Sequence, residues 1–267
     1  LKGCPLRCVW CHNPESISPR PEVSFVPQRC IGCGYCFRVC PTGAHRMGVD
    51  RSGDRPQQSH MLDRTVCERC GLCTRECYAQ ALEYVGREAT VDEVIGEVLR
   101  DQPFYAHSGG GMTLSGGEPL FQPAFAAALL EAAQREHIHC CVETSGHAPW
   151  GHVERLRPFV DLWLYDIKET DPERHVEHTG VSNERVLGNL RALHEAGAGI
   201  LLRCPIVPGL NDRPDHFEGI ARLCNELPRV EGVELLPYHP LGDSKRDRFG
   251  IDPAQRTHRA TPDPSGH

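Results

Sequence analysis

The sequence predicts an α/β protein, a partial, TIM-like (β/α)6 barrel that carries a small cysteine-rich insert. Strand and helix signals alternate from residue 90 to residue 239, which indicates a parallel sheet or barrel. Polar residues follow the predicted strands, where barrels of this class place their functional side chains. Eleven of the fifteen cysteines fall within the first 77 residues, in short regular spacings. These features assign residues 1–22 and 85–251 to the barrel and residues 23–84 to the insert.

Length and composition narrow the class of protein. A chain of 267 residues with 39% hydrophobic content can form one large domain, or a domain with an insert, around a real core. The net charge of −7 and the lack of a long basic run argue against a nucleic-acid surface. No apolar stretch approaches about 20 residues and no leader pattern is present, so the sequence predicts no membrane span. Because Leu1 stands directly before the first cysteine motif, we expect a clipped sequence with a damaged first strand.

The number and spacing of the cysteines indicate metal binding. An odd count of fifteen argues against a complete disulfide framework. The tight Cys-x2-Cys and Cys-x3-Cys groups are typical of metal sites in a reducing compartment. We therefore expect a cytoplasmic protein that works at low oxygen.

Cys4, Cys8 and Cys11 form a Cys-x3-Cys-x2-Cys triplet at the start of the chain. Three thiolates are too few for a closed tetrahedral site, and a cubane iron–sulfur cluster normally takes four. A cubane on three thiolates leaves one iron open, and an open metal position can bind a substrate. The alternative is a structural zinc knuckle with His12 as a fourth ligand, which the eight further cysteines in ferredoxin spacing disfavour.

Two tandem runs in the insert match the bacterial ferredoxin pattern: Cys30-x2-Cys33-x2-Cys36-x3-Cys40 and Cys67-x2-Cys70-x2-Cys73-x3-Cys77. In that pattern the fourth cysteine of each run serves the other cluster. We therefore expect one cluster on Cys30, Cys33, Cys36 and Cys77, and a second on Cys67, Cys70, Cys73 and Cys40. Zinc binding is the disfavoured alternative. The polar residues 50–60 between the runs are expected to form a loop.

From Thr90 onward the chain alternates helices and strands. Thr90-Val-Asp-Glu93 is a capping box, and the apolar residues from Val91 to Leu99 follow helical spacing. Further helices are predicted over 122–136, 152–157, 184–195 (with Gly197 as the C′ residue) and 214–226. Strands are predicted over 112–115, 138–142, 161–165, 199–202 and 233–236. A strand that ends at Lys2 makes six, so we expect an incomplete, laterally open barrel and a disordered tail over 252–267.

Polar residues lie at or just past the predicted strand ends, at the functional rim of such a barrel. They are Glu118, Glu143, Asp166, Lys168, Arg203 and His239. Each has an ordinary alternative: Glu118 could cap the next helix, Glu143 and Thr144 could form a turn, and Lys168 or His239 could be solvated or buried without a ligand. The remaining cysteines are expected as small buried apolar residues, namely Cys140, Cys141, Cys204 and Cys224. The polar loop 243–248 is expected to be solvated, though it could touch a partner.

Taken together, these motifs resemble the radical S-adenosylmethionine (SAM) superfamily, and within it the activating enzymes of glycyl radical enzymes, such as the pyruvate formate-lyase activating enzyme. The tandem ferredoxin insert resembles the larger subgroup of these enzymes. The family's residues before the triplet and after Gly250 are missing here. The resemblance is carried by Gly3-Cys-Pro-Leu-Arg-Cys-Val-Trp-Cys-His-Asn-Pro-Glu-Ser16, Ser115-Gly-Gly-Glu-Pro119, Glu143-Thr-Ser-Gly146, Asp166-Ile-Lys168, Thr179-Gly180, Arg203 to Asp212, and Leu236-Pro-Tyr-His239.

The resemblance implies three [4Fe-4S] clusters and a bound SAM. Cys4, Cys8 and Cys11 would hold the SAM-binding cluster. The SAM contacts would be Trp10, His12, Gly116, Gly117, Glu118, Glu143, Thr144, Asp166, Ile167, Lys168, Arg203 and His239. Reductive cleavage of SAM would give a 5′-deoxyadenosyl radical that takes hydrogen from a glycine Cα of a partner glycyl radical enzyme.

The insert would then relay electrons from a low-potential donor such as flavodoxin or ferredoxin. Two other functions compete with this one. The chain could be a radical SAM enzyme that acts on a small molecule or peptide, or an iron–sulfur electron-transfer protein with a non-catalytic barrel. The triplet argues against the electron carrier, because a carrier has no use for an open iron. Neither a nucleic acid nor a membrane is expected as a partner.

Overall fold

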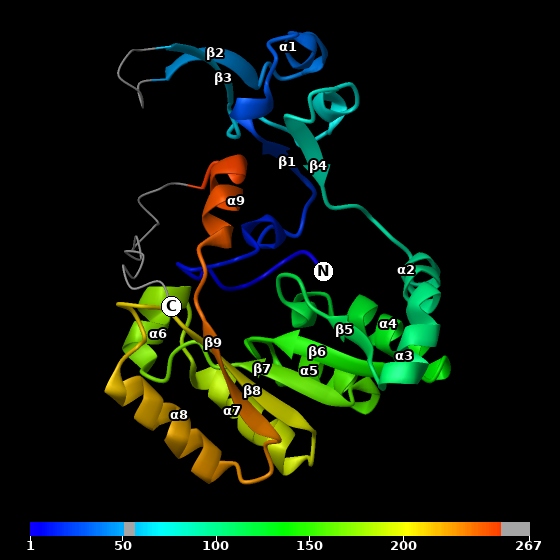
Figure 1. The fold of residues 1–267 in the computed structure, drawn as a ribbon, viewed down its shortest axis with the longest axis vertical. Coiled ribbons are helices and arrows are strands. Elements are labelled where there is room, and N and C mark those ends of the chain that lie inside the picture. The colour runs from blue at the N-terminus through cyan, green and yellow to red at the C-terminus, as the bar shows by residue number, and fades with distance from the viewer. Residues whose placement is uncertain (51–56, 252–267) are drawn as a thin grey trace.

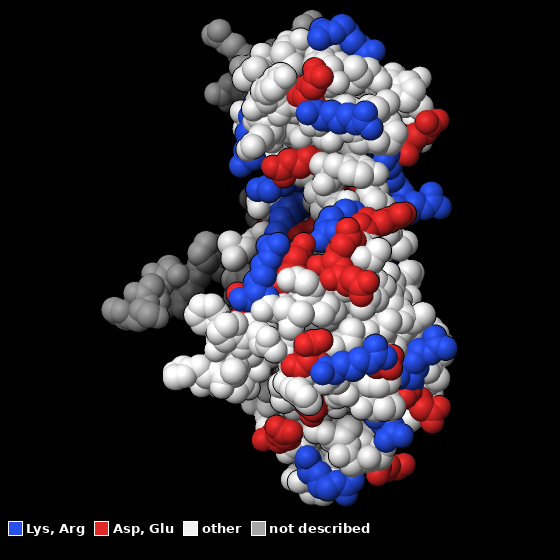
Figure 2. Space-filling view, turned by 90° about the vertical axis from the view of Figure 1, so that its right-hand side faces the viewer, with Lys and Arg blue, Asp and Glu red and all other residues white. Residues whose placement is uncertain are grey.

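The computed structural model describes residues 1–50 and 57–251. Its two parts follow one another along the long axis, with the cysteine-rich insert at one end and a parallel sheet with its helices at the other (Figure 1). The tail over 252–267, predicted to be disordered, lies outside the described residues. On the face shown in Figure 2, acidic and basic side chains are interspersed, with a dense group at the narrowing between the two parts.

The parallel sheet has five strands in the sequential order β5-β6-β7-β8-β9. They are β5 (Gly111–Leu114), β6 (His139–Thr144), β7 (Leu162–Asp166), β8 (Ile200–Ile206) and β9 (Gly232–Pro237). Because the strands are parallel and in sequential order, their carboxyl ends meet at one edge of the sheet. Among the described residues β5 and β9 do not pair, so the sheet is open.

The sixth strand, which was predicted to end at Lys2, is not formed. The first residues instead join the end of β5 through irregular backbone hydrogen bonds, from Gly117 N to Leu1 O at 2.9 Å and from Glu118 N to Gly3 O at 2.8 Å. The (β/α)6 count was therefore wrong in detail, whereas the parallel α/β core was predicted correctly.

Helices cross from strand to strand over the sheet (Figure 1). They are α2 (Val91–Val98), α3 (Gln102–Ser108), α4 (Pro123–Arg135), α5 (Trp150–Leu156), α6 (Pro172–Thr179), α7 (Glu184–Glu195) and α8 (Pro214–Glu226). The predicted capping box is present, since Thr90 and Glu93 each bond the other's backbone. Gly197 has a φ of 74° after α7, as a C′ glycine requires. Between the helices and the sheet lies the main core, with Trp163, Leu190 and Leu202 fully buried.

The insert consists of two small antiparallel pairs around a second core. Strand β1 (Glu22–Phe25) pairs with β4 (Leu82–Val85), and β2 (His45–Asp50) pairs with β3 (Gln57–Leu62). The short helix α1 (Tyr35–Val39) lies within the first cysteine run. The predicted loop over 50–60 was partly wrong, because β3 begins at Gln57; residues 51–56 lie outside the described part of the chain.

The segment 243–248, predicted to be a solvated loop, lies within helix α9 (Leu241–Phe249). Arg246 is only 5% exposed and donates hydrogen bonds to the carbonyls of Cys8 (2.9 Å) and Val9 (2.7 Å). Lys245 reaches Glu15 at 2.7 Å. Helix α9 therefore holds the triplet segment in place. No helix in the described part of the chain is long and apolar enough to cross a membrane.

Candidate functional site

A cavity of about 380 Å³ opens at the carboxyl ends of the strands, and the triplet forms one of its walls. All three triplet cysteines line it. Of the twelve predicted cofactor contacts, ten line it as well: Trp10, His12, Gly116, Gly117, Glu143, Thr144, Asp166, Lys168, Arg203 and His239. Residues as far apart in the chain as Cys4 and His239 therefore share one cavity.

The triplet cysteines are half-buried and free of disulfides. Burial, with a smaller contribution from neighbouring triplet sulfurs, raises the pKa of Cys4 to about 11 and that of Cys8 to about 12. The Lys168 ammonium opposes this and favours the thiolates. Three converging thiols beside a cation form a donor set that suits an anionic iron–sulfur cluster, since ligation would displace the protons.

The triplet segment is fixed by backbone hydrogen bonds to α6. Arg7 N donates to Thr179 O at 2.7 Å, and Val9 N donates to His178 O at 2.9 Å. The Trp10 ring also packs edge-on against the His178 ring, with centroids 5.4 Å apart. Together with α9, the segment is thus held by two separate helices, which follow β7 and β9 in the chain.

Two ion pairs at the ends of the strands set the charge of the cavity. Lys168 Nζ lies 3.0 Å from Asp166 Oδ2. Burial lowers the pKa of Lys168, but the Asp166 carboxylate and the triplet sulfurs outweigh it and raise the pKa above its usual range. Arg203 lies 2.6 Å from Glu143, which also accepts a hydrogen bond from the Ser115 hydroxyl at 2.6 Å. The wall therefore presents ordered cations and anions to a zwitterionic ligand.

The Gly116-Gly117 turn packs directly on the triplet segment. Gly116 has a φ of 128°, and a Cβ there would lie 2.1 Å from Leu1 O. A Cβ on Gly117 would lie 2.5 Å from Gly3 O. We expected these glycines to permit a close approach to a cofactor; the close approach that the structure contains is to the backbone of the triplet segment.

Glu118 and Ile167 do not line the cavity, unlike the other predicted contacts. Ile167 is 1% exposed and belongs to the main core. The Glu118 carboxylate is equally buried and accepts hydrogen bonds from the Leu120 and Ser145 backbones and from the Thr144 and Ser145 hydroxyls, at 2.6–3.1 Å. This geometry corresponds to the capping alternative for Glu118, because its carboxylate ties two strand-end loops together.

The rings of His12 and His239 stack at the mouth of the cavity, with centroids 4.2 Å apart and planes 17° apart. Burial, followed by the neighbouring His239, lowers the pKa of His12. The two imidazoles therefore form a flat surface on the wall of the cavity, which suits a planar ligand group.

A buried network behind the cavity was missed by the sequence analysis. The Glu169 carboxylate is fully buried and lies 3.1 Å from Arg213 and 3.2 Å from His216 Nδ1. Asn211 joins the same region by donating to the carbonyl of Lys168 at 2.9 Å. The only available signal was the position of Glu169 directly after Lys168 and before the helix cap at Asp171.

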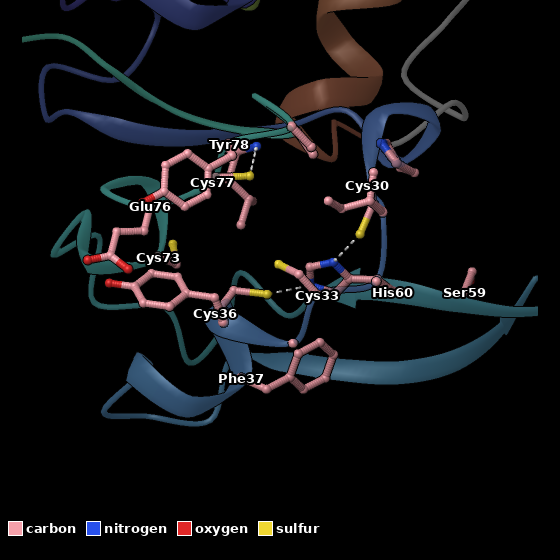
Figure 3. A pocket seen from close by; sticks show the side chains of 18 of the residues that line it. Cys30, Cys33, Cys36, Phe37, Ser59, His60, Cys73, Glu76, Cys77 and Tyr78 are labelled. Atoms are coloured by element: carbon pink, nitrogen blue, oxygen red, sulfur yellow. Dashed lines mark hydrogen bonds between the residues drawn. The ribbon is translucent and has the colours of Figure 1, made fainter.

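The insert contains two adjacent cavities, and each predicted cysteine group lines one of them. We call the first the distal cavity; it is lined by Cys30, Cys33, Cys36 and Cys77 (Figure 3). The second, the proximal cavity, is lined by Cys40, Cys67, Cys70 and Cys73. Cys73 reaches the wall of both.

The names reflect the distance of each cavity from the barrel. The proximal cavity is lined by Val23, next to Glu22 at the barrel end of β1. Nearby, Arg64 bonds Val23 O and the carbonyl of Arg248 in α9. The distal cavity is instead reached from the far ends of β1 and β4, at Pro27 and Leu82.

Comparison with known proteins identifies two matching families. The model of the radical SAM superfamily matches residues 67–224, and that of the 4Fe-4S dicluster domain matches residues 29–81. The chain is 46% identical over 251 residues to the isethionate sulfite-lyase activating enzyme of Oleidesulfovibrio alaskensis, covering 92% of this chain and 78% of that protein. It is 39% identical to the benzylsuccinate synthase activating enzyme of Thauera aromatica (94% and 75% covered) and to the choline trimethylamine-lyase activating enzyme of Oleidesulfovibrio alaskensis (94% and 80% covered).

Proposed function

The chain belongs to the radical SAM superfamily, among the activating enzymes of glycyl radical enzymes, and from this we propose that it uses three [4Fe-4S] clusters, one at the triplet and two in the insert. Its activity is the reductive cleavage of SAM to a 5′-deoxyadenosyl radical, which takes a hydrogen atom from a glycine of a partner enzyme. The chemistry of bond cleavage is supplied by the bound cluster and SAM, while the chain binds, orients and excludes water.

We assign the triplet cluster to Cys4, Cys8 and Cys11. The observation that supports this assignment best is that the three thiols share one cavity with a buried ammonium, a guanidinium and carboxylates. Three protein ligands leave one metal position for the amino and carboxylate groups of SAM. An anionic cluster also offsets the cost of burying Lys168 at this wall.

The remaining wall residues are proposed to contact different groups of SAM. Asp166 and Lys168 face the ribose and carboxylate side, with Arg203 assisting them, and the Gly116-Gly117 turn faces the methionine ammonium. The stacked His12 and His239 rings close over the adenosyl group. Glu118 and Ile167 support this wall from behind, since neither lines the cavity.

In the insert, we assign one cluster to the distal cavity and one to the proximal cavity. This order places the proximal cluster between the distal one and the triplet. A low-potential donor such as flavodoxin or ferredoxin would deliver electrons at the distal side, where Cys33 is exposed. The insert would then pass them toward the SAM cavity.

The partner is a glycyl radical enzyme, and we propose one of the isethionate sulfite-lyase kind. Three isethionate sulfite-lyase activating enzymes are 44–46% identical to this chain, whereas activating enzymes named for benzylsuccinate synthase and choline trimethylamine-lyase are 39% identical. The open edge of the sheet leaves the cavity mouth accessible to a segment of that partner.

Anaerobic reconstitution followed by metal analysis and electron paramagnetic resonance (EPR) tests these assignments. About twelve irons per chain are expected from three [4Fe-4S] clusters. The reduced protein should release 5′-deoxyadenosine and generate a glycine-centred EPR signal on an isethionate sulfite-lyase but not on a benzylsuccinate synthase. A signal on the second enzyme alone would refute the partner assignment.

Replacing Cys33 with serine separates the relay from the SAM site. The variant should keep the triplet cluster and its spectral response to SAM, but cleave SAM more slowly when reduced through a protein donor. A rate of cleavage equal to that of the unchanged protein would refute the relay.

A further inference from the structure

Two histidines join the distal and proximal cavities of the insert. His60, on β3, lines the distal cavity, and His45, on β2, lines the proximal one. His45 Nδ1 and His60 Nε2 are 2.8 Å apart, which is a short hydrogen bond. His45 pairs with Leu62 in the β2–β3 ladder, so His60 is its diagonal neighbour on the same face of the hairpin.

The other nitrogen of His60 points to a cysteine of the distal cavity (Figure 3). His60 Nδ1 lies 3.5 Å from Cys30 Sγ, within range for a hydrogen bond to sulfur. His60 Nε2, the nitrogen that contacts His45, also lies 3.8 Å from Cys36 Sγ. A continuous chain of polar contacts therefore leads from Cys30 through His60 to His45.

Packing holds the His60 ring in this orientation. Its centroid lies 4.5 Å from that of Phe25 and 5.0 Å from that of Phe37. Phe25 belongs to β1 and Phe37 to α1, so the ring is held between two elements of the insert core. A hydrogen bond from a ring fixed in this way loses little conformational entropy.

The acceptor at Cys30 selects one tautomer of the pair. A hydrogen bond between two imidazoles needs an N–H group on one ring and a lone pair on the other. A ligating thiolate can only accept, so the stable arrangement has His60 Nδ1–H donating to Cys30 and His45 Nδ1–H donating to His60 Nε2. The reverse arrangement would turn a lone pair of His60 toward the thiolate. His45 thus fixes the tautomer of His60, as outer partners do for metal-bound histidines.

We propose that His45 and His60 form a hydrogen-bonded bridge between the two cluster cavities, in which His60 donates to the Cys30 thiolate and raises the reduction potential of the distal cluster. Hydrogen bonds to cluster sulfurs are among the determinants of cluster potential. A donor stabilises the reduced state more, because reduction adds negative charge. The proximal cavity has no equivalent imidazole–sulfur hydrogen bond among the described residues, so the bridge makes the two sites unequal. This inference rests on the proposed two-cluster insert.

A redox titration of the full chain tests the bridge. To isolate the insert, Cys4, Cys8 and Cys11 are replaced with alanine, and the two remaining clusters are titrated under EPR. In this background, His60→Leu should lower one midpoint potential and leave the other unchanged. The expected change is about a tenfold fall in the reduced-to-oxidised ratio at a fixed potential, or about 59 mV for a one-electron couple.

Two further variants separate the hydrogen bond from packing. His60→Gln keeps an N–H donor on a side chain of similar reach and should restore most of the midpoint. His45→Leu removes the imidazole that fixes the tautomer of His60, and it should lower the same midpoint by a smaller amount. Unchanged midpoints in both His60→Leu and His45→Leu would overturn the inference. If His60→Leu does not load its clusters, the other two variants decide. Equal midpoints for His60→Gln, His45→Leu and the background would overturn the inference. A midpoint that is lower only in His45→Leu would support it.

Metal analysis distinguishes failure of the bridge from failure of the proposed clusters. The background protein should contain about eight irons, and a lower content would refute the two-cluster insert itself. Cys36, His45 and His60 are also close enough to ligate a single ion, with ligand atoms within 4.8 Å of one another. One zinc per chain that disappears in His60→Leu would overturn the bridge in favour of such a site.

Discussion

Replacing Glu169 with glutamine should lower the free energy of unfolding by about 3 kcal/mol at neutral pH. The carboxylate is fully buried, between the Arg213 guanidinium at 3.1 Å and His216 Nδ1 at 3.2 Å. It also accepts hydrogen bonds from the backbones of Thr170 and Asp171 at 2.9 and 3.1 Å. Glutamine has nearly the same shape, but it has no charge for Arg213 and presents an amide N–H group to other donors.

The magnitude follows from the pKa of Glu169. Burial alone raises this pKa, but the His216 imidazole, the Asp171 N–H and Arg213 outweigh burial and lower it from 4.5 to about 2. Each pKa unit corresponds to about 1.4 kcal/mol, which gives about 3 kcal/mol. Because the folded pKa is lowered, this stabilisation is present above about pH 4.5 and is lost as the pH falls toward 2.

Urea unfolding followed by circular dichroism measures the effect. Both proteins are prepared without metal, so that acid release of clusters does not enter. The difference between them should be constant from about pH 8 to 5 and shrink below about pH 4.5. Glu177→Gln, on the exposed face of α6, is the matched control and should stay within about 0.5 kcal/mol. A Glu169→Gln difference below about 1 kcal/mol at neutral pH, or one that is unchanged at pH 3, would refute the reasoning.

Three other changes test the site and its support. Thr90→Ala removes the capping box and should cost about 1 kcal/mol in urea unfolding, with no change in iron content. Gly117→Ala places a Cβ against Gly3 O, so it should displace the triplet segment and reduce iron by about four per chain; full iron content would contradict this. Arg203→Leu leaves Glu143 without its cation and should weaken SAM binding in equilibrium dialysis by about tenfold or more. Arg191→Leu, which breaks an exposed ion pair between α7 and α8, should leave SAM binding unchanged.

Much of the fold could be predicted because its elements carry local signals. The helices predicted over 184–195 and 214–226 are formed as α7 and α8, and both bury one face on the sheet. Helix α9 could not be found in this way. Its segment is polar, and its buried residue Arg246 contacts carbonyls at Cys8 and Val9, 237 residues or more away in the chain.

The site was predictable in position but not in the direction of each side chain. Parallel strands bring their ends to one edge, so Asp166, Lys168 and Arg203 were expected together and do share a cavity. Glu118 follows a strand in the same way, yet its carboxylate turns away from the cavity to four donors. The direction of the Glu118 side chain depends on Thr144 and Ser145, which lie at the end of a different strand. The spacing of residues in the sequence does not reveal this contact.

The contact between α9 and the triplet has a consequence for how the protein matures. Cys4, Cys8 and Cys11 are synthesised well before Arg246, which fastens their loop through the carbonyls of Cys8 and Val9. The loop that carries these three thiols is therefore fastened only after helix α9 has been synthesised. The insert, whose eight thiols lie between residues 30 and 77, can be filled much earlier. On the proposed assignment of the clusters, those of the insert can therefore form before the one at the triplet.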